Sequence, residues 1–246
     1  MMFSYDEQLA QLVAHDVPSI DAVVDTLQAV DGLLDGSRDG LKWFNTLYLQ
    51  VTLAVRERVR KNDFADVTGS TFVGDLDFVF ANFYFAALRT WLAGDMAATP
   101  ESWQLLFSAR SNAALARVQF ALVGVNAHIN RDLAVAVAKL CGDFGVQPTH
   151  DTAQYQAYTA VNATLDSLIE QAKRELMVSL PGDELPGADL VEQVTAAWGV
   201  KAARESAWVH AEILWVIANE APLADRFIAT LDGTAALAGK ALLVVG

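Results

Sequence analysis

The segment from Ser111 to about Leu140 constrains the fold more than any other part of the sequence, because it would be apolar on nearly every side of a helix. A helix that is hydrophobic all round has to be buried by other elements. Most other segments also repeat apolar residues at helical spacing, with short breaks between them. The sequence therefore predicts an all-α protein: one domain over residues 1–246, a bundle of about eight to nine helices around a long central apolar helix.

Local signals place several of the surrounding helices. Ser19 is a typical N-cap residue for a helix that begins at Ile20. An aromatic-rich helix is expected to open at Ser70 or Thr71 and to reach Leu92. Further helices are predicted over residues 42–61, from Thr99-Pro100-Glu101, from 148–151 to 177, over 189–219 and over 223–243, with a loop at 181–187.

Composition limits the classes of partner. Hydrophobic residues make up 53% of the 246 residues, and the net charge is −13, which repels phosphate backbones and anionic lipid surfaces. Nucleic acid and membranes are therefore not expected as partners. A single cysteine, Cys141, excludes an internal disulfide and a thiolate zinc cage. The N-terminus lacks the pattern of a signal peptide, so a cytoplasmic location is expected. The oligomeric state stays open, a homodimer included.

The most informative polar residues lie inside the apolar central helix. His128 and Asp132 are four positions apart, so they share one face of a helix and their side chains can converge. That geometry suits a histidine oriented by a carboxylate for proton transfer, and it also suits a pair of metal ligands. A buried charge without a partner is costly, so other groups must complete the site.

Candidate partners come from several parts of the chain. Asn126, Asn130 and Arg131 flank the pair, and Trp208 lies in a segment that mixes charge and tryptophan. Together with Asn82 and Tyr84 from the aromatic helix, they are the expected substrate-binding residues. If a single divalent metal is bound, Asp77 and His150 are expected to join His128 and Asp132 as its ligands.

Each candidate also has a structural reading. Asn126, His128, Asn130 and Asp132 can form a buried hydrogen-bond network that only packs helices. Asp75 and Asp77 can complement the dipole near a helix N-terminus, and His150 can be a capping or surface residue. Arg204, Glu205 and Glu212 are expected to form ordinary surface pairs.

The sequence contains none of the glycine-rich loops that bind phosphates or dinucleotides, no nucleophile elbow and no H-E-x-x-H motif. Accordingly, no organic cofactor is predicted. The leading hypothesis is an enzyme of the lyase, cyclase or hydrolase type that acts on a largely apolar small molecule, with His128 as general acid or base. The alternative is a non-catalytic helical binding or interaction protein.

Residues 126–133, Asn-Ala-His-Ile-Asn-Arg-Asp-Leu, resemble the signature of a bacterial all-helical family of unknown function. The likeness extends from about residue 40 to residue 215 and includes residues 43–48, 77–85 and 203–208. This resemblance implies a helical fold and no particular activity.

A second resemblance is to the zinc-dependent phospholipase C and P1-type nuclease group, which is all-helical and uses an H-x-x-x-D pair as zinc ligands. His128 and Asp132 match that pair, and residues 142–150 are similar to its G-D-x-x-Q-P-x-H run. The order and spacing differ from that group. Four histidines cannot supply a three-zinc cluster, so the resemblance implies at most a single metal ion.

Overall fold

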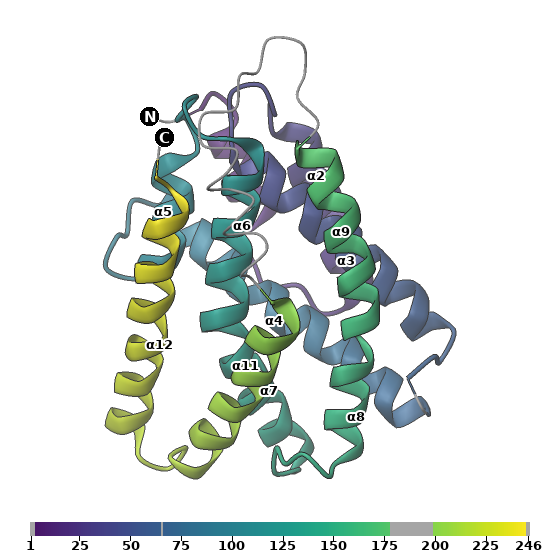
Figure 1. Cartoon of the computed structure of the whole chain (residues 1–246). Helices are drawn as coiled ribbons and strands as arrows, with labels where there is room; N and C mark the ends of the chain where they lie inside the picture. Colours follow the sequence, from purple (N-terminus) through teal and green to yellow (C-terminus); the bar gives the residue numbers. More distant parts are fainter. Residues whose placement is uncertain (1–2, 65, 178–198, 245–246) are drawn as a thin grey trace.

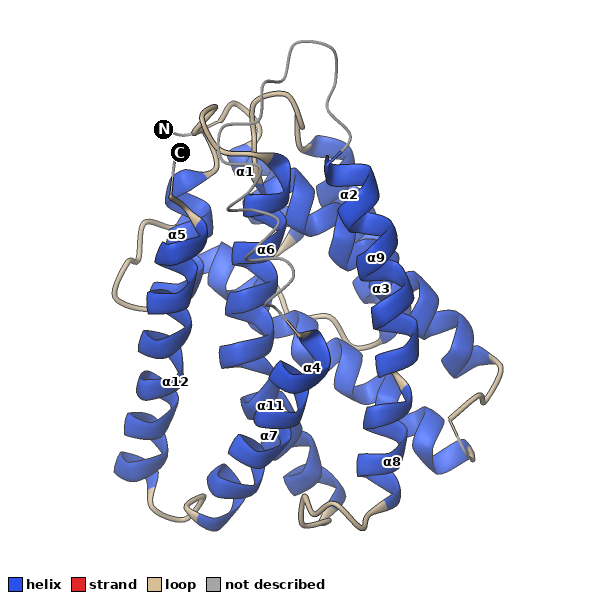
Figure 2. Cartoon of the chain, in the orientation of Figure 1, coloured by secondary structure: helices blue, strands red, loops and turns tan. Residues whose placement is uncertain are grey.

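A computed structural model describes residues 3–64, 66–177 and 199–244, and within these ranges the chain forms helices and no strand (Figure 2). The predicted all-α fold is confirmed. The elements are α1 (Asp6–Leu12), α2 (Ile20–Leu33), α3 (Leu41–Arg60), α4 (Val67–Leu92), α5 (Glu101–Ala109), α6 (Arg117–Ala127), the π-helix η1 (His128–Asp132), α7 (Leu133–Phe144), α8 (Ala153–Ala160), α9 (Asn162–Met177), α11 (Val200–Val216) and α12 (Ala221–Leu242).

The predicted central apolar helix consists of α6, η1 and α7, whose backbone stays helical from Arg117 to Phe144. It starts later than Ser111 because Asn112 forms a turn, in which its side chain accepts a hydrogen bond from the Ala114 amide at 3.0 Å. Nearly every residue of α6 is buried, as expected for a helix that is apolar all round. This continuous helical segment, the central rod, ends at Gly145, whose φ of +64° is readily adopted by glycine.

Helix α4 begins at Val67, earlier than the predicted start at Ser70 or Thr71. The Asp66 side chain caps it by accepting a hydrogen bond from the Gly69 amide at 2.7 Å. Asp75 and Asp77 therefore lie in the third turn, beyond the reach of the helix dipole. The dipole interpretation of these two residues is wrong.

The N-terminus of α5 is capped from another helix. Asp232 of α12 accepts hydrogen bonds from the backbone amides of Glu101 at 2.7 Å and Ser102 at 3.1 Å. The predicted cap, Thr99, instead donates its hydroxyl to the Asp95 carbonyl at 2.8 Å. The carboxylate satisfies amides that have no partner within the helix and lies at its positive end, so it fixes α12 against α5.

The segments after residue 148 differ from expectation at their ends. The helix predicted to start at 148–151 starts at Ala153, because the Thr152 side chain accepts a hydrogen bond from the Tyr155 amide. It is interrupted at Val161, between α8 and α9. The predicted loop at 181–187 and the predicted helical residues 189–198 lie outside the described residues.

Two large hydrophobic clusters and two small ones lie among the described residues. The first large cluster is built mainly from α4, α7, α8 and α11, and the second mainly from α1 to α6. Figure 1 shows α12 beside α5 and α6, consistent with the contacts between these helices. Helix α11 packs on α7. Because η1 joins α6 to α7, it lies where the two large clusters meet.

Helix α4 is the one helix in the described part of the chain that is long and apolar enough to cross a membrane by length and composition. Of its most apolar window, 61% is buried within the structure. The core helix of a soluble protein has the same properties, and here α4 contributes to both large hydrophobic clusters.

Candidate functional site

The π-helix η1 carries the His–Asp pair. The Nδ1 atom of His128 lies 3.1 Å from Oδ2 of Asp132, so the two side chains converge as their spacing predicts. The side chains are almost completely buried, with 4% and 0% of their surfaces exposed. Single π-helical turns inside longer helices occur frequently at functional sites. Here the turn places the pair in the interior of the bundle.

Asp132 has three side-chain partners and binds no backbone group through its side chain among the described residues. Besides His128, the indole nitrogen of Trp103 donates to Oδ2 at 2.9 Å, and Nη1 of Arg131 donates to Oδ1 at 2.5 Å. Because the carboxylate accepts, His128 carries its proton on Nδ1 and presents the lone pair of Nε2. Within the described residues, Nε2 is buried and has no hydrogen-bond partner.

Aromatic rings fix the plane of the imidazole. The Phe80 ring lies parallel to it, with centroids 3.4 Å apart and planes 7° apart. The Tyr48 ring meets it edge-on at 4.7 Å. Phe44, Tyr84 and Trp103 surround it at centroid distances of 6.0, 6.4 and 5.6 Å. Packing of this kind holds the ring in one orientation.

His128 borders a cavity of about 100 Å³. Most of the lining is apolar. Apart from His128, four lining residues carry polar groups, namely Tyr48, Asp77, Tyr158 and Arg204, and the Tyr158 hydroxyl already donates to the Arg204 carbonyl at 2.7 Å. The remaining lining residues are Phe44, Leu47, Val51, Val55, Val73, Leu76, Phe80, Val125, Ile129, Leu133, Val161, Leu165 and Val200. An apolar cavity with a few convergent polar groups is the usual form of a small-molecule site.

Burial sets the protonation states in this cavity. It lowers the pKa of His128 despite the opposing effect of Asp132, so the imidazole is neutral at neutral pH. It raises the pKa of Asp77 to about 8, so this carboxyl is largely protonated at neutral pH. Asp77 is only partly exposed, and it borders the cavity. Its Oδ1 atom is buried and has no hydrogen-bond partner among the described residues.

Tyr48 supplies a second neutral hydroxyl. Burial, followed by the charges of Asp77 and Asp132, raises its pKa well above the ordinary value, so the phenol stays protonated. The nearby Thr52 hydroxyl opposes this increase without forming a hydrogen bond of normal geometry. The cavity therefore combines one proton acceptor, Nε2 of His128, with two neutral donors.

The predicted amide residues lie elsewhere. Asn126, near the end of α6, donates to the Ala235 carbonyl of α12 at 2.7 Å and accepts from Asn130 of η1 at 2.9 Å, so it joins α6 to α12. Asn82 accepts from the Val17 amide at 2.8 Å and donates to the Val17 carbonyl at 3.0 Å. None of these three asparagines lines the cavity. Their hydrogen bonds fit the structural interpretation of the polar residues.

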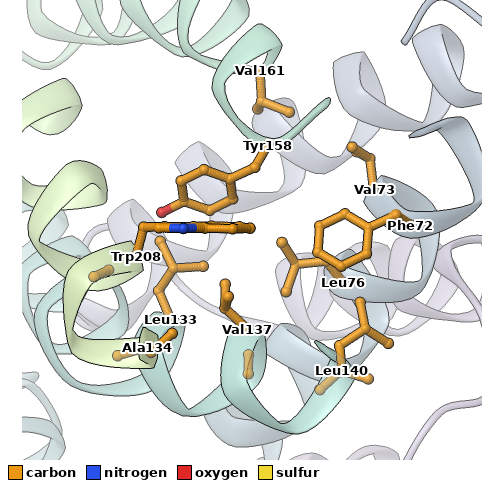
Figure 3. Close-up of a cluster of buried hydrophobic side chains, with 14 of the residues drawn as sticks. Phe72, Val73, Leu76, Leu133, Ala134, Val137, Leu140, Tyr158, Val161 and Trp208 are labelled. Carbon is orange, nitrogen blue, oxygen red and sulfur yellow. The ribbon is translucent and has the colours of Figure 1, made fainter. Parts of the chain in front are cut away.

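The other predicted substrate-binding residues are near the cavity without lining it. The Tyr84 hydroxyl lies 3.5 Å from Oδ1 of Asn45. Arg131 pairs with Asp132. Figure 3 shows Trp208 packed beside Tyr158, and their ring centroids are 5.0 Å apart. Trp208 therefore supports a cavity wall.

His150 does not contact His128. It lies at the surface, with its two ring nitrogens 2.8 Å from Glu205 and 2.8 Å from Glu212. The surface interpretation of His150 thus describes its position. In the part of the chain that the structure describes, no three His, Cys, Asp or Glu side chains are grouped as metal ligands.

Arg204 is not the surface residue that the sequence suggests. It is 6% exposed and lies against the ring of Tyr158, with its guanidinium carbon 4.0 Å from the ring centroid. Nothing in the sequence distinguishes it from its charged neighbours. Tyr48, Phe80 and Trp103 were also missed, because the sequence places them only in apolar stripes.

A model of a family of unknown function, DUF5995, matches residues 20–245. The chain belongs to the DUF5995 family. The match contains the His–Asp pair and all cavity-lining residues, and the expected membership in an all-helical family of unknown function is confirmed. No protein with a curated description and no solved structure matches this DUF5995 chain.

Proposed function

We propose that this DUF5995 protein is an enzyme that transfers a proton to or from a largely apolar small molecule bound in the cavity. The observation that carries the proposal is the buried, unpartnered Nε2 of His128, a residue that lines the cavity and whose Nδ1 is held by Asp132. A neutral imidazole oriented by a carboxylate is suited to act as general base.

The two neutral donors indicate which substrates fit. When a base removes a proton beside a carbonyl, negative charge develops on the carbonyl oxygen, and hydrogen-bond donors stabilise it. A tyrosine together with a carboxylic acid kept protonated by an apolar site can serve this purpose. Tyr48 and Asp77 have these protonation states and line the same cavity as His128. The proposed chemistry is therefore proton abstraction next to a carbonyl, as in lyases and isomerases.

Cavity size limits the substrate. An apolar cavity of about 150 Å³ is known to bind benzene. At about 100 Å³, this cavity accommodates a small molecule or one apolar group of a larger one. A single metal ion bound through Nε2 of His128 would alter the chemistry, and elemental analysis of the purified protein tests for it.

The test needs no knowledge of the product. Small ketones such as cyclohexanone and 2-pentanone are incubated with the protein in D₂O, and exchange of the protons beside the carbonyl is followed by NMR. We expect exchange with the wild-type protein and its loss in His128→Gln, because glutamine can still donate to Asp132 but supplies no base. Equal exchange rates for the two proteins would overturn the proposal.

The alternative is a non-catalytic small-molecule-binding or interaction protein in which the same groups only specify packing. The hydrogen bonds of Asn126 and Asn82 to backbone groups favour it for those two residues. Under this alternative, His128→Gln lowers the unfolding temperature and leaves exchange unchanged at the uncatalysed rate.

A further inference from the structure

Arg204 is a buried cation on the cavity wall that the proposed proton transfer does not use. Its Nε donates to Oδ1 of Asn162 at 2.7 Å, and its Nη2 donates to the Tyr158 carbonyl at 2.8 Å. A guanidinium has five N–H groups, so these two bonds use only part of its capacity. Its pKa is lowered by burial, yet the ordinary value is so high that the group remains charged.

Among the side chains that the structure describes, no carboxylate forms an ion pair with Arg204. Arg110 is also buried, and its charge is compensated by ion pairs with both Asp6 and Asp39. A buried cation without a counter-ion is costly, because it loses hydration without gaining an ion pair. An anion in the cavity would supply the missing partner.

We propose that Arg204 binds the carboxylate of the ligand, so that the substrate class is small, largely apolar carboxylic acids that carry a second carbonyl group for the proton transfer. This inference rests on the proposed function and adds the substrate class to it. The planar fork of a guanidinium matches a carboxylate, which can accept two parallel hydrogen bonds. The small, mostly apolar cavity suits a short hydrocarbon body better than a hydrated phosphate group.

The positions of Arg204 and His128 support one orientation of the ligand. Arg204 contacts residues of α8 and α9, whereas His128 is surrounded by rings from α3, α4 and α5. Valine and leucine side chains, including Val161 and Leu133, line the same cavity as Arg204 and His128. The carboxylate would bind at Arg204, and the apolar body would extend over these side chains and bring the second carbonyl group towards His128.

The first experiment uses the wild-type protein alone. Hexanoate and hexanamide have nearly the same shape and differ in charge, and their affinities are compared by isothermal titration calorimetry. A charge-assisted hydrogen bond to a buried arginine should make hexanoate bind about tenfold to a hundredfold tighter. The inference is overturned if hexanamide binds equally well or better, or if hexyl phosphate binds more tightly than hexanoate.

Variants then locate the preference. Arg204→Met should abolish the advantage of hexanoate over hexanamide, and Arg204→Lys should reduce it because the fork is lost. Arg58→Met is the matched control: Arg58 also donates to a helix carbonyl, that of Ala160, and stacks on a ring, that of Phe64, but it pairs with Asp63 and does not line the cavity. Its loss should leave the preference intact.

The two proposals fail separately. His128→Gln should retain the preference for hexanoate, since it leaves Arg204 in place, while it loses proton exchange. A wild-type protein that exchanges ketone protons but binds both probes equally would refute only the role of Arg204. A wild-type protein that prefers hexanoate but shows no exchange dependent on His128 would refute only the proton-transfer function.

Discussion

The imidazole of His128 lies flat on the ring of Phe80, with centroids 3.4 Å apart and planes 7° apart. The two residues belong to η1 and α4, so this contact joins the central rod to the longest helix of the described chain. It fixes the plane of the imidazole, while the hydrogen bond to Asp132 fixes the rotation of the ring within that plane. Together they determine the direction in which Nε2 points.

Replacing Asp132 tests this arrangement. Asp132→Asn removes the charge that three donors share, and it can reverse the tautomer of His128. We expect a loss of about 2–4 kcal/mol in the free energy of unfolding, because a buried hydrogen-bond network is broken. Ketone-proton exchange should fall by about 10²-fold to 10⁴-fold, since the wrong tautomer presents no base. Urea unfolding measures the first effect and NMR of the ketone in D₂O the second, while nitrogen NMR of the imidazole identifies the tautomer.

The control for Asp132 is Asp143→Asn on α7, where the carboxylate is exposed and pairs only with Lys139. This variant should stay within about 0.5 kcal/mol of the wild type. If Asp132→Asn is equally mild, the carboxylate neither orients nor stabilises His128.

Asp77 should make stability depend on pH. Its pKa is raised by burial to about 8 in the folded protein and is near 3.8 when the group is free. Between these values the unfolded chain has lost the proton that the folded protein keeps, so the stability falls as the pH rises from about 4 to about 8. Asp77→Asn removes this loss. The free energy of unfolding of the variant minus that of the wild type should therefore increase by more than about 2 kcal/mol between pH 4 and pH 9. At pH 9 the variant should be the more stable of the two proteins.

Urea unfolding at several pH values measures the effect of Asp77→Asn. Asp75→Asn, on the same helix, is the matched control: burial also raises the pKa of Asp75, but much less of this residue is enclosed. Parallel pH profiles of Asp77→Asn and the wild type would show that the Asp77 carboxyl is not kept protonated.

His150 should contribute stability only at low pH. Hydrogen bonding to Glu205, followed by the charge of Glu212, raises its pKa above the ordinary 6.5 despite a small opposing effect of burial. A raised pKa means that the contribution is complete below the unfolded value near 6.5 and is lost as the pH rises through the folded value. His150→Gln should thus be less stable than the wild type at pH 5.5, by about 0.5 kcal/mol because the pairs are exposed, and equally stable at pH 9. Thermal unfolding at both pH values decides; a difference that persists at pH 9 refutes the charge interaction.

Gly124 should not tolerate a methyl group. A Cβ atom there would lie 2.8 Å from Cβ of Phe44, and closer still to its ring. Gly124→Ala should destabilise the protein by about 1–3 kcal/mol, although alanine favours a helix by about 1 kcal/mol. Phe44 also lines the cavity, so the affinity for hexanoate should fall as well.

The control for Gly124 is Gly233→Ala in α12, where no atom lies within 4 Å of the new methyl group. This variant should stabilise the protein by about 0.5–1 kcal/mol. Denaturant midpoints of the two variants should shift in opposite directions.

The sequence by itself determined the helical fold, the buried rod and the convergence of His128 with Asp132. These follow from apolar periodicity and from the spacing of four along a helix, which are local properties. Helix starts such as Ser19 were also readable, because a cap acts on the next turn. The start of α4 was not, since Asp66, Ser70 and Thr71 are all acceptable caps.

Only the tertiary structure decided what surrounds the pair. The cap of α5 comes from Asp232, 130 residues along the chain from Ser102. Asn126 and Asn82 form hydrogen bonds with backbone groups of other segments. Tyr48, Asp77 and Arg204, by contrast, come from three helices and line one cavity. Burial then shifts their pKa values, and burial depends on the packing of residues distant in sequence. The local sequence pattern does not determine this long-range packing. For that reason the sequence predicted a surface position for Arg204, whereas the structure shows it to be buried.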